Sequence, residues 1–175
     1  MGFFDKFKKA EPAKPAPITV KTVPTAVYAP VAGEGVEQAS LPDQVFASGV
    51  MGKAYGIKPE GGVIYAPVAG TITATTDTLH AVGLSTDDDI EVLIHVGVDT
   101  VNMKGEGFTG FIEKGQRIVA GEPLMTFDSE KIKKAGYDDT VIVVITNTDD
   151  LAKVEPIAAK HVDAGEKIFD VKVAN

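Results

Sequence analysis

The stretch Ile90-Glu91-Val92-Leu93-Ile94-His95-Val96-Gly97-Val98-Asp99 alternates apolar residues with residues of other kinds. A period of two is typical of a strand, whose successive side chains point to opposite faces of a sheet. One face carries no polar side-chain atom and is predicted to be the core face: Ile90, Val92, Ile94, Val96 and Val98. His95 therefore points away from the core, over a shallow, partly apolar floor formed by Leu93 and Gly97.

The rest of the chain after residue 25 has the same character. It is rich in Val, Ile, Thr and Gly, and short apolar runs are separated by turn signals such as Gly61-Gly62 and Ala120-Gly121. This pattern predicts an all-β fold, an antiparallel sandwich or barrel. Two stretches are predicted as short helices: 129–135, with Ser129 as N-cap, and 148–154.

A seven-residue segment occurs twice. Val-Tyr-Ala-Pro-Val-Ala-Gly at positions 27–33 returns as Ile-Tyr-Ala-Pro-Val-Ala-Gly at positions 64–70, with six of the seven positions identical. Two copies are too few for a solenoid, which needs at least about three. The repeat therefore predicts a duplicated β motif, in which Pro marks a strand edge and Gly closes a turn.

Residues 1–25 differ from the domain predicted at 26–175. They contain four of the ten prolines, and the part from about Glu11 to Pro24 is predicted to be an extended linker. Before it, Phe3, Phe4 and Phe7 share one face if the segment is helical. Residues 1–9 are thus interpreted either as an amphipathic foot on an anionic membrane surface or as a frayed terminus.

Composition excludes several classes of protein. The 175 residues contain 17 Lys and Arg against 25 Asp and Glu, a net charge of -8 that argues against a nucleic-acid partner. There is no Cys, which excludes disulfides, thiolate metal sites and cysteine nucleophiles. No apolar run reaches the roughly 18 residues of a membrane span, and no secretory signal is evident, so we expect a cytoplasmic protein.

Only three residues are His. If residues 76–81 form a strand, Thr76, Thr78 and His80 share a face, and Thr78 can bond an imidazole and fix its tautomer. The acidic turn 85–89 then places His80 and His95 on antiparallel neighbours, where Cβ atoms on one face stand about 5 Å apart. His161 lies in a polar stretch and is predicted to be a surface residue.

Two converging imidazoles leave three chemistries open. Zinc would need a third ligand, for which Asp99 is the candidate. A Ser-His-Asp hydrolase would need a nucleophile elbow, and no G-x-S-x-G is present. A phosphohistidine needs only a neutral imidazole, which the ordinary histidine pKa of about 6.5 supplies at cytoplasmic pH.

The chain resembles the glucose-family IIA component of the bacterial phosphoenolpyruvate-dependent sugar phosphotransferase system. The resemblance rests on the Ile94–Val101 stretch, Thr78-Leu79-His80-Ala81, Ala66–Ile72, Val45-Phe46-Ala47 and Lys104–Phe108, and covers nearly everything from about Thr25 to Val173. It implies a β sandwich built from a duplicated barrel-sandwich hybrid motif. It departs at Thr76, where some relatives have an aromatic residue.

The resemblance also implies roles. His95 would carry the phosphoryl group on its Nε2 (tele) atom, His80 would stabilise that group, and Thr78 would bond the imidazole network. Residues of the docking face or its margin would be Phe46, Leu93, Asp43 and Asp99. The implied partners are a histidine phosphocarrier protein and the IIB domain of a sugar transporter. No cofactor is obligatory, with zinc conceivable only between His80 and His95 at a partner interface.

Two further hypotheses stay open: one is an alternative to the phosphocarrier hypothesis, and the other is an addition to it. Residues 66–72 and 114–124 also resemble lipoyl and biotinyl carrier domains, in which Lys131 would stand near the attachment point. A regulatory binding module, whose partners depend on its phosphorylation, is compatible with the phosphocarrier hypothesis.

Overall fold

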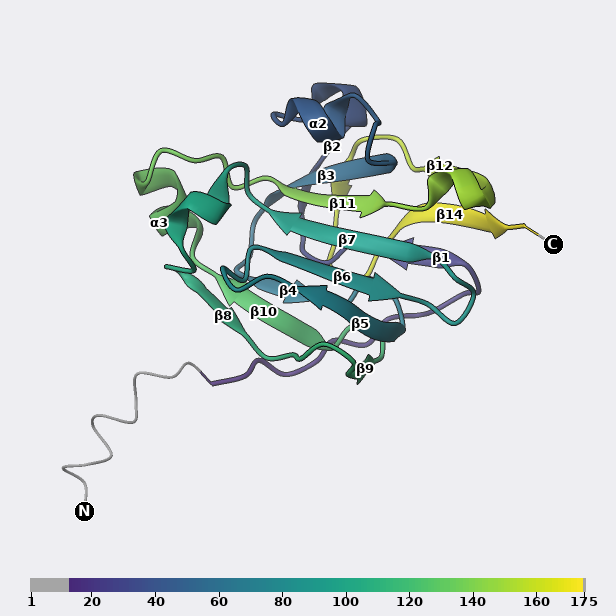
Figure 1. Cartoon of the computed structure of the whole chain (residues 1–175), viewed down its shortest axis with the longest axis horizontal. Coiled ribbons are helices and arrows are strands. Elements are labelled where there is room, and N and C mark those ends of the chain that lie inside the picture. The colour runs from purple at the N-terminus through teal and green to yellow at the C-terminus, as the bar shows by residue number, and fades with distance from the viewer. Residues whose placement is uncertain (1–12, 175) are drawn as a thin grey trace, which may run out of the picture.

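Three antiparallel β-sheets make up most of residues 13–174, the part of the chain that the computed structural model describes (Figure 1). The large sheet has the strand order β13 (His161–Val162), β2 (Gly33–Val36), β3 (Lys53–Pro59), β11 (Val141–Ile145), β7 (Glu91–Val96), β6 (Ala81–Ser85), β5 (Gly70–Thr75) and β9 (Arg117–Ile118). The two small sheets are β1 (Ala26–Tyr28), β14 (Lys167–Val173), β12 (Leu151–Pro156) and β4 (Val63–Tyr65), β10 (Pro123–Phe127), β8 (Phe108–Gly110). The predicted all-β sandwich is confirmed.

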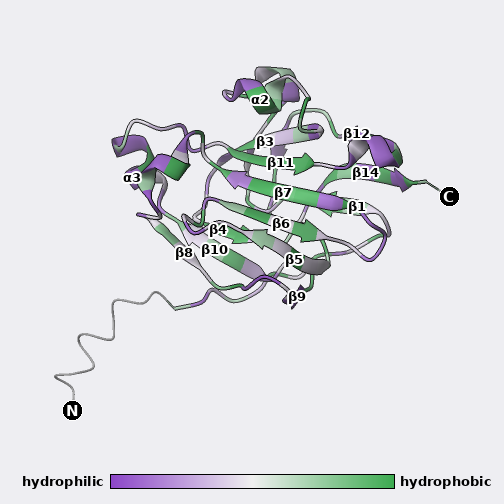
Figure 2. Ribbon diagram, viewed as in Figure 1, coloured by the Kyte–Doolittle hydropathy of each residue, from purple (hydrophilic) through white to green (hydrophobic). Residues whose placement is uncertain are grey.

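The centre of the large sheet positions the rest. All five residues of β11 are buried, which suits the unbroken Val/Ile run of a strand covered on both faces; Figure 2 shows it hydrophobic along its length. Its neighbour β7 alternates between buried and more exposed residues, so its Ile and Val side chains enter the main core as predicted. The alternation ends at Val96, since Gly97 turns the chain with φ +78°. Val98, which was predicted for the core face, is therefore only half-buried and lies outside the main core.

The repeated segment forms two equivalent strand-turn-strand units that bond to each other. Tyr28 N–H donates to the carbonyl of Pro67, and in return Tyr65 N–H donates to the carbonyl of Pro30, both at 2.9 Å. The first unit joins β1 to β2 and the second joins β4 to β5. These reciprocal bonds confirm the duplicated motif and make it a pseudo-twofold centre.

A second repeat completes the duplication. Residues 120–122 and 164–166 are both Ala-Gly-Glu, and each forms a turn before a core strand. Ala66 N–H donates to the carbonyl of Glu122 at 2.8 Å, just as Ala29 N–H donates to the carbonyl of Glu166 at 2.7 Å. Each half of the fold thus repeats the same inter-segment bonds.

The short helices depart partly from expectation. The helix predicted at 129–135 is α3 (Ser129–Lys134), but its N-cap is Asp128, whose carboxylate accepts from Lys131 N. The helix predicted at 148–154 is wrong: only a 3-10 turn, η3 (Thr148–Asp150), precedes β12. Three short helical segments were not predicted: the 3-10 helices η1 (Gln38–Ser40) and η2 (Thr100–Met103), and the α-helix α2 (Gln44–Ala47). Tertiary pairing with β14 overrides local helix propensity in 151–154.

The expected linker is only partly free of the domain. Residues 13–23 have no regular secondary structure, yet Ile18 and Val20 are half-buried, and Ile18 N–H donates to the carbonyl of Gly121 at 3.0 Å. The two side chains lie over the equivalent turn residues Gly121 and Gly165. Residues 18 and 20 thus contact the domain predicted at 26–175, and the boundary at residue 26 stays a prediction. The predicted foot, residues 1–9, lies outside the described residues.

Within residues 13–174, every helix is too short and too polar to cross a membrane.

Candidate active site

His95 lies near the end of β7 on the face away from the main core, half-buried, as predicted. Its Nδ1 atom is 2.7 Å from the carbonyl oxygen of Gly97. A carbonyl oxygen can only accept a hydrogen bond, so Nδ1 must carry the proton. In the neutral ring, Nε2 then has the free lone pair, and Nε2 is the nucleophilic atom.

Gly97 is required at this turn. Its φ of +78° is a conformation that other residues rarely adopt. A Cβ atom there would stand 2.4 Å from Cγ2 of Thr100 and 2.9 Å from the carbonyl oxygen of Asp138. Thr100, fully buried, donates its hydroxyl to the carbonyl of Val96 at 2.5 Å. The carbonyl that orients His95 is therefore held by packing on two sides.

His80 reaches the site from a turn and not from the predicted strand. Residues 76–80 form a tight turn with Leu79 at φ +60°, and β6 starts only at Ala81. The turn is fixed because Val96 N–H donates to the carbonyl of His80 at 2.8 Å, next to the Ala81–His95 pair of the ladder. The antiparallel neighbourhood of β6 and β7 is confirmed.

The two imidazoles converge as expected. Their ring centroids are 5.0 Å apart and their planes are nearly perpendicular, at 79°. On His80, Nδ1 is 2.5 Å from the hydroxyl oxygen of Thr78 and 3.3 Å from that of Thr76. Both hydroxyls thus approach one nitrogen, which leaves Nε2 of His80 for other partners.

Phe46 also packs on His95, with ring centroids 5.2 Å apart. It lies on α2, whose N-cap is Asp43; the Asp43 side chain accepts a hydrogen bond from Val45 N at 2.9 Å. Phe46 is 6% exposed and belongs to a small apolar cluster with Leu93 on the outer face of the large sheet. It therefore contacts the imidazole more than it offers surface to a partner, whereas Leu93 is half-buried beneath it.

Burial sets the protonation state of both rings. The pKa of His95 is lowered from 6.5, chiefly by desolvation; the Gly97 carbonyl and the charges of Asp43 and Asp99 oppose this only in part. The pKa of His80 is also lowered, by desolvation and by the nearby His95. Both rings are consequently neutral at pH 7.

Asp43 and Asp99 flank the site, as the resemblance implied. Asp43 is half-buried and committed to its helix, while Asp99 is exposed and has a left-handed backbone at φ +60°. Between Ala13 and Ala174, no group of three His, Asp or Glu side chains is arranged to hold a metal ion. Asp99 does not join His80 and His95 in such a group among these residues, and zinc binding stays a prediction.

His161 is exposed on β13, away from the other two histidines, as predicted. Its Nε2 is 2.9 Å from a carboxylate oxygen of Glu60, which raises the pKa of His161. It is an ion-pair residue of the surface.

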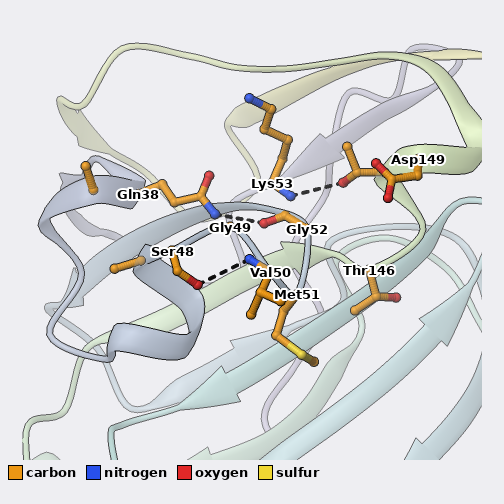
Figure 3. A pocket seen from close by; sticks show the side chains of 12 residues that line it. Gln38, Ser48, Gly49, Val50, Met51, Gly52, Lys53, Thr146 and Asp149 are labelled. Carbon is orange, nitrogen blue, oxygen red and sulfur yellow. Dashed lines mark hydrogen bonds between the residues drawn. The ribbon is translucent and has the colours of Figure 1, made fainter.

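The chain after α2 is held as a defined turn beside a cavity of about 410 Å³ (Figure 3). The Gln38 side chain donates to the carbonyls of Phe46 and Gly52, at 2.9 and 2.8 Å. The turn exposes two apolar side chains, Val50 at 77% and Met51 at 38%. Gln38 thereby anchors both the helix that carries Phe46 and the exposed turn.

Sequence reasoning missed two contributors. Thr76 was noted only for its face and as a departure from relatives, yet its hydroxyl is within 3.3 Å of His80. Gly97 was interpreted as floor, whereas its carbonyl sets the His95 tautomer. The Thr-x-Thr-x-His spacing was an available signal for the first; a backbone carbonyl leaves no sequence signal.

Comparison with known proteins decides the family. The family described as "phosphoenolpyruvate-dependent sugar phosphotransferase system, EIIA 1" matches residues 25–151, well over half of the chain. The chain belongs to this family. A "PTS system glucose-specific EIIA component" of Halalkalibacterium halodurans is 43% identical over 148 residues, covering 84% of this chain and 86% of the relative.

Longer relatives contain the same domain. A "PTS system beta-glucoside-specific EIIBCA component" of Bacillus subtilis is 41% identical over 138 residues, and the corresponding protein of Dickeya chrysanthemi is 46% identical over 138 residues. The match covers 74% and 79% of this EIIA chain. The chain spans only 23% and 22% of the length of these two relatives.

A solved structure has the same fold. The glucose permease IIA from Mycoplasma capricolum superposes with a TM-score of 0.76 at 28% identity, covering 87% of this EIIA chain and 98% of that one. The family match favours a phosphotransferase-system component over the lipoyl or biotinyl carrier alternative. Lys131, its proposed attachment point, lies inside helix α3.

Proposed function

We propose that this EIIA chain is a phosphocarrier that accepts a phosphoryl group on Nε2 of His95 and passes it to the IIB domain of a sugar transporter. The donor is a phosphohistidine carrier protein. In each step one N–P bond breaks as another bond to phosphorus forms, and the leaving nitrogen keeps the electron pair. The observation that carries the proposal is the contact between Nδ1 of His95 and the Gly97 carbonyl, because it leaves Nε2 unprotonated.

The same contact stabilises the phosphorylated ring. When Nε2 bonds to phosphorus while Nδ1 keeps its proton, the imidazole acquires positive charge, which the Gly97 carbonyl and the nearby Asp43 and Asp99 offset. Those carboxylates repel the phosphoryl oxygens at the same time. We infer a carrier that holds its group briefly, and the chemistry rests on positioning and electrostatics.

His80 supports the transfer as a hydrogen-bond donor. If the Thr78 hydroxyl donates to Nδ1, the proton of neutral His80 resides on Nε2, the tautomer that can donate to a phosphoryl oxygen. A donor aimed at the oxygens whose charge shifts during transfer lowers the barrier. Thr78 acts through His80, so it is a positioning residue.

Exposed apolar side chains belong to two segments, the one that carries Phe46 and the one that follows the Gly97 turn, and they are suited to transient docking. Val45 is 52% exposed on α2, directly before Phe46, and Val101 is 49% exposed on η2, just after the Gly97 turn. Val50 and Met51 continue this surface beyond α2. Donor and acceptor must both reach His95, so they use this surface in turn, with a small, short-lived interface.

The relatives support the choice of acceptor. The Bacillus subtilis relative is named an EIIBCA component, in which B, C and A parts share one chain. Zinc bridging His80 and His95 to a partner, a cytoplasmic location and membrane contact through residues 1–9 stay predictions.

A second candidate function is regulatory binding. Phosphorylation adds about two negative charges to a surface whose exposed members Val45 and Val101 are apolar. A partner that fits the bare form would be released. Pull-downs with phosphorylated and unphosphorylated protein test this, and identical partner sets would remove the regulatory role.

The test of the main proposal is a reconstituted relay from phosphoenolpyruvate through the phosphocarrier protein to a IIB domain. His95→Ala should take up no phosphoryl group. His80→Ala should still be labelled on His95 but pass the group on slowly. His161→Ala, which removes an imidazole far from the site, should behave as the natural chain. Labelling of His95→Ala at the normal rate would contradict the proposal.

A further inference from the structure

A cavity of about 590 Å³ is lined by residues of η2 and α3 and of the segments that follow them. Helix α3 lies at the end of the large sheet where β7 finishes (Figure 1). Three lysines line it: Lys104 after η2, and Lys131 and Lys134 on α3. Glu106 is the acidic residue of the lining. Nothing in the phosphocarrier mechanism uses this cavity.

Its charge is opposite to that of the chain. The protein carries a net charge of -8, yet three lysines and one glutamate surround this cavity. In the described part of the chain, none of the three lysines makes an ion pair, whereas the neighbouring Lys133 lies 3.8 Å from Asp139. The three ammonium groups are therefore available to an external anion.

The backbone at Lys104 is unusual for a lysine. Its φ is +56°, in the left-handed region, where Gly or Asn is normally favoured. The turn is held by bonds from Lys104 N to Val101 O at 3.2 Å and from Glu106 N to Met103 O at 3.1 Å.

The floor of the cavity is apolar, and its wall adjoins the active site. Met103 and Tyr137 line it and pack on the main core. Gly105, next to Lys104, lies beside the backbone of Thr78: a Cβ built on it would be 3.8 Å from the Thr78 Cα. The turn that follows Lys104 therefore lies against the segment that carries Thr78 and His80.

We propose that this cavity binds a small organic phosphate, with the phosphoryl group among Lys104, Lys131 and Lys134 and the organic part on Met103 and Tyr137. Lysine ammonium groups bind phosphate as point charges. An apolar floor beside them favours an ester over inorganic phosphate.

A purely structural role explains only part of the cluster. Lys131, Lys133 and Lys134 stand in the last turn of α3, where positive charge is favourable next to the helix C-terminus. Lys104 belongs to another segment, after η2, and is not part of that last turn. The convergence of two segments on one cavity is what indicates a ligand.

The experiment is a titration of the full chain with phenyl phosphate and with inorganic phosphate, followed by amide NMR shifts. Lys104→Gln/Lys131→Gln/Lys134→Gln is compared with Lys153→Gln/Lys167→Gln/Lys172→Gln, which removes the same charge from β12 and β14. Phenyl phosphate should bind more tightly than phosphate and shift residues of η2 and α3. The first variant should bind at least about tenfold more weakly, and the second as the natural chain.

Three results would overturn the proposal: shifts outside η2 and α3, equal weakening in both triple variants, or no binding of either probe while the first variant loses docking of a protein partner. The last result would assign the lysines to a protein interface. Phosphorylation of His95 without any added anion should be normal in both variants. The titration does not depend on phosphoryl transfer, so failure of this site is distinguishable from failure of the phosphocarrier function.

Discussion

Nδ1 of His95 lies 2.7 Å from the carbonyl oxygen of Gly97, two residues further along the chain. This hydrogen bond links a residue near the end of strand β7 to a glycine with a left-handed backbone. It decides which nitrogen of the His95 ring is nucleophilic. The geometry is local, but it depends on distant packing, because Gly97 N–H donates to the carbonyl of Thr140 at 2.9 Å.

Substitution Gly97→Ala is predicted to damage both stability and the site. The new methyl group would overlap Thr100 and the Asp138 carbonyl, in addition to the cost of a positive φ. We expect a loss of about 2–4 kcal/mol in the free energy of unfolding. Chemical denaturation measures this, and imidazole ¹⁵N shifts report whether the His95 proton leaves Nδ1.

The matched control is Gly136→Ala, since Gly136 has φ +90° and nothing within 4 Å of the new methyl group. It should cost only about 1 kcal/mol. Equal destabilisation by the two substitutions would show that overlap at Gly97 is unimportant.

Removal of the Thr78 hydroxyl by Thr78→Val should release the His80 tautomer. We expect phosphoryl transfer to IIB to slow about tenfold or more, with folding preserved. Thr76→Val should have a smaller effect, because its hydroxyl is 3.3 Å from Nδ1 against 2.5 Å for Thr78. Rapid-quench transfer assays and His80 ¹⁵N shifts make the comparison; a larger effect of Thr76→Val would reverse the assignment.

The rate of His95 phosphorylation should be insensitive to pH from 8 down to about 6.5. Burial lowers the pKa of His95 below its ordinary 6.5, so the nucleophilic neutral ring persists until the pH falls below that value. Because the unfolded ring binds its proton first, stability contributed by the buried rings also falls as pH drops below 6.5.

Rapid-quench labelling across pH 5–8, with the donor's own profile subtracted, measures the effect. The control is His161→Ala, which removes a histidine whose pKa is raised by Glu60. Its pH profile should equal that of the natural chain. If the rate fell to half its value before the pH, lowered from 8, had reached 6.5, the result would contradict a buried, neutral acceptor.

Phe46→Ala and Val45→Ala should separate positioning from docking. Phe46 is 6% exposed and contacts His95, so its truncation should cost about 3–5 kcal/mol of stability and hydrate the imidazole. Val45 is 52% exposed, so its truncation should change stability by less than about 0.5 kcal/mol yet weaken partner binding. Thermal unfolding and binding titrations distinguish the two, and unaltered partner affinity in Val45→Ala would remove it from the docking surface.

The sequence predicted what depends on periodicity and repetition. The alternation in residues 90–96 fixed the faces of β7 and the outward position of His95. The repeated Ala-Pro-Val-Ala-Gly predicted the duplication that the reciprocal Tyr28 and Tyr65 bonds confirm. The acidic turn at 85–89 predicted antiparallel neighbours on either side of it, and β6 and β7 pair in this way.

What could not be predicted depends on tertiary contacts. Residues 76–80 have strand composition, but Leu79 adopts a left-handed turn. Residues 151–154, which belong to the stretch predicted as a helix, instead form part of β12 and pair with β14. Ile18 and Val20 lie in a stretch of linker composition. Their contact with the domain could not be predicted, because the turns that they cover come from residues about a hundred or more further along the chain.

The central claim is that the phosphoryl group is carried on Nε2 of His95. NMR of the ¹⁵N-histidine-labelled, phosphorylated protein tests it directly, because ³¹P–¹⁵N coupling identifies the bonded nitrogen. The account predicts coupling to Nε2 of His95, with Nδ1 still protonated. Phosphorus on Nδ1 of His95, on His80, or on a residue other than histidine would contradict it.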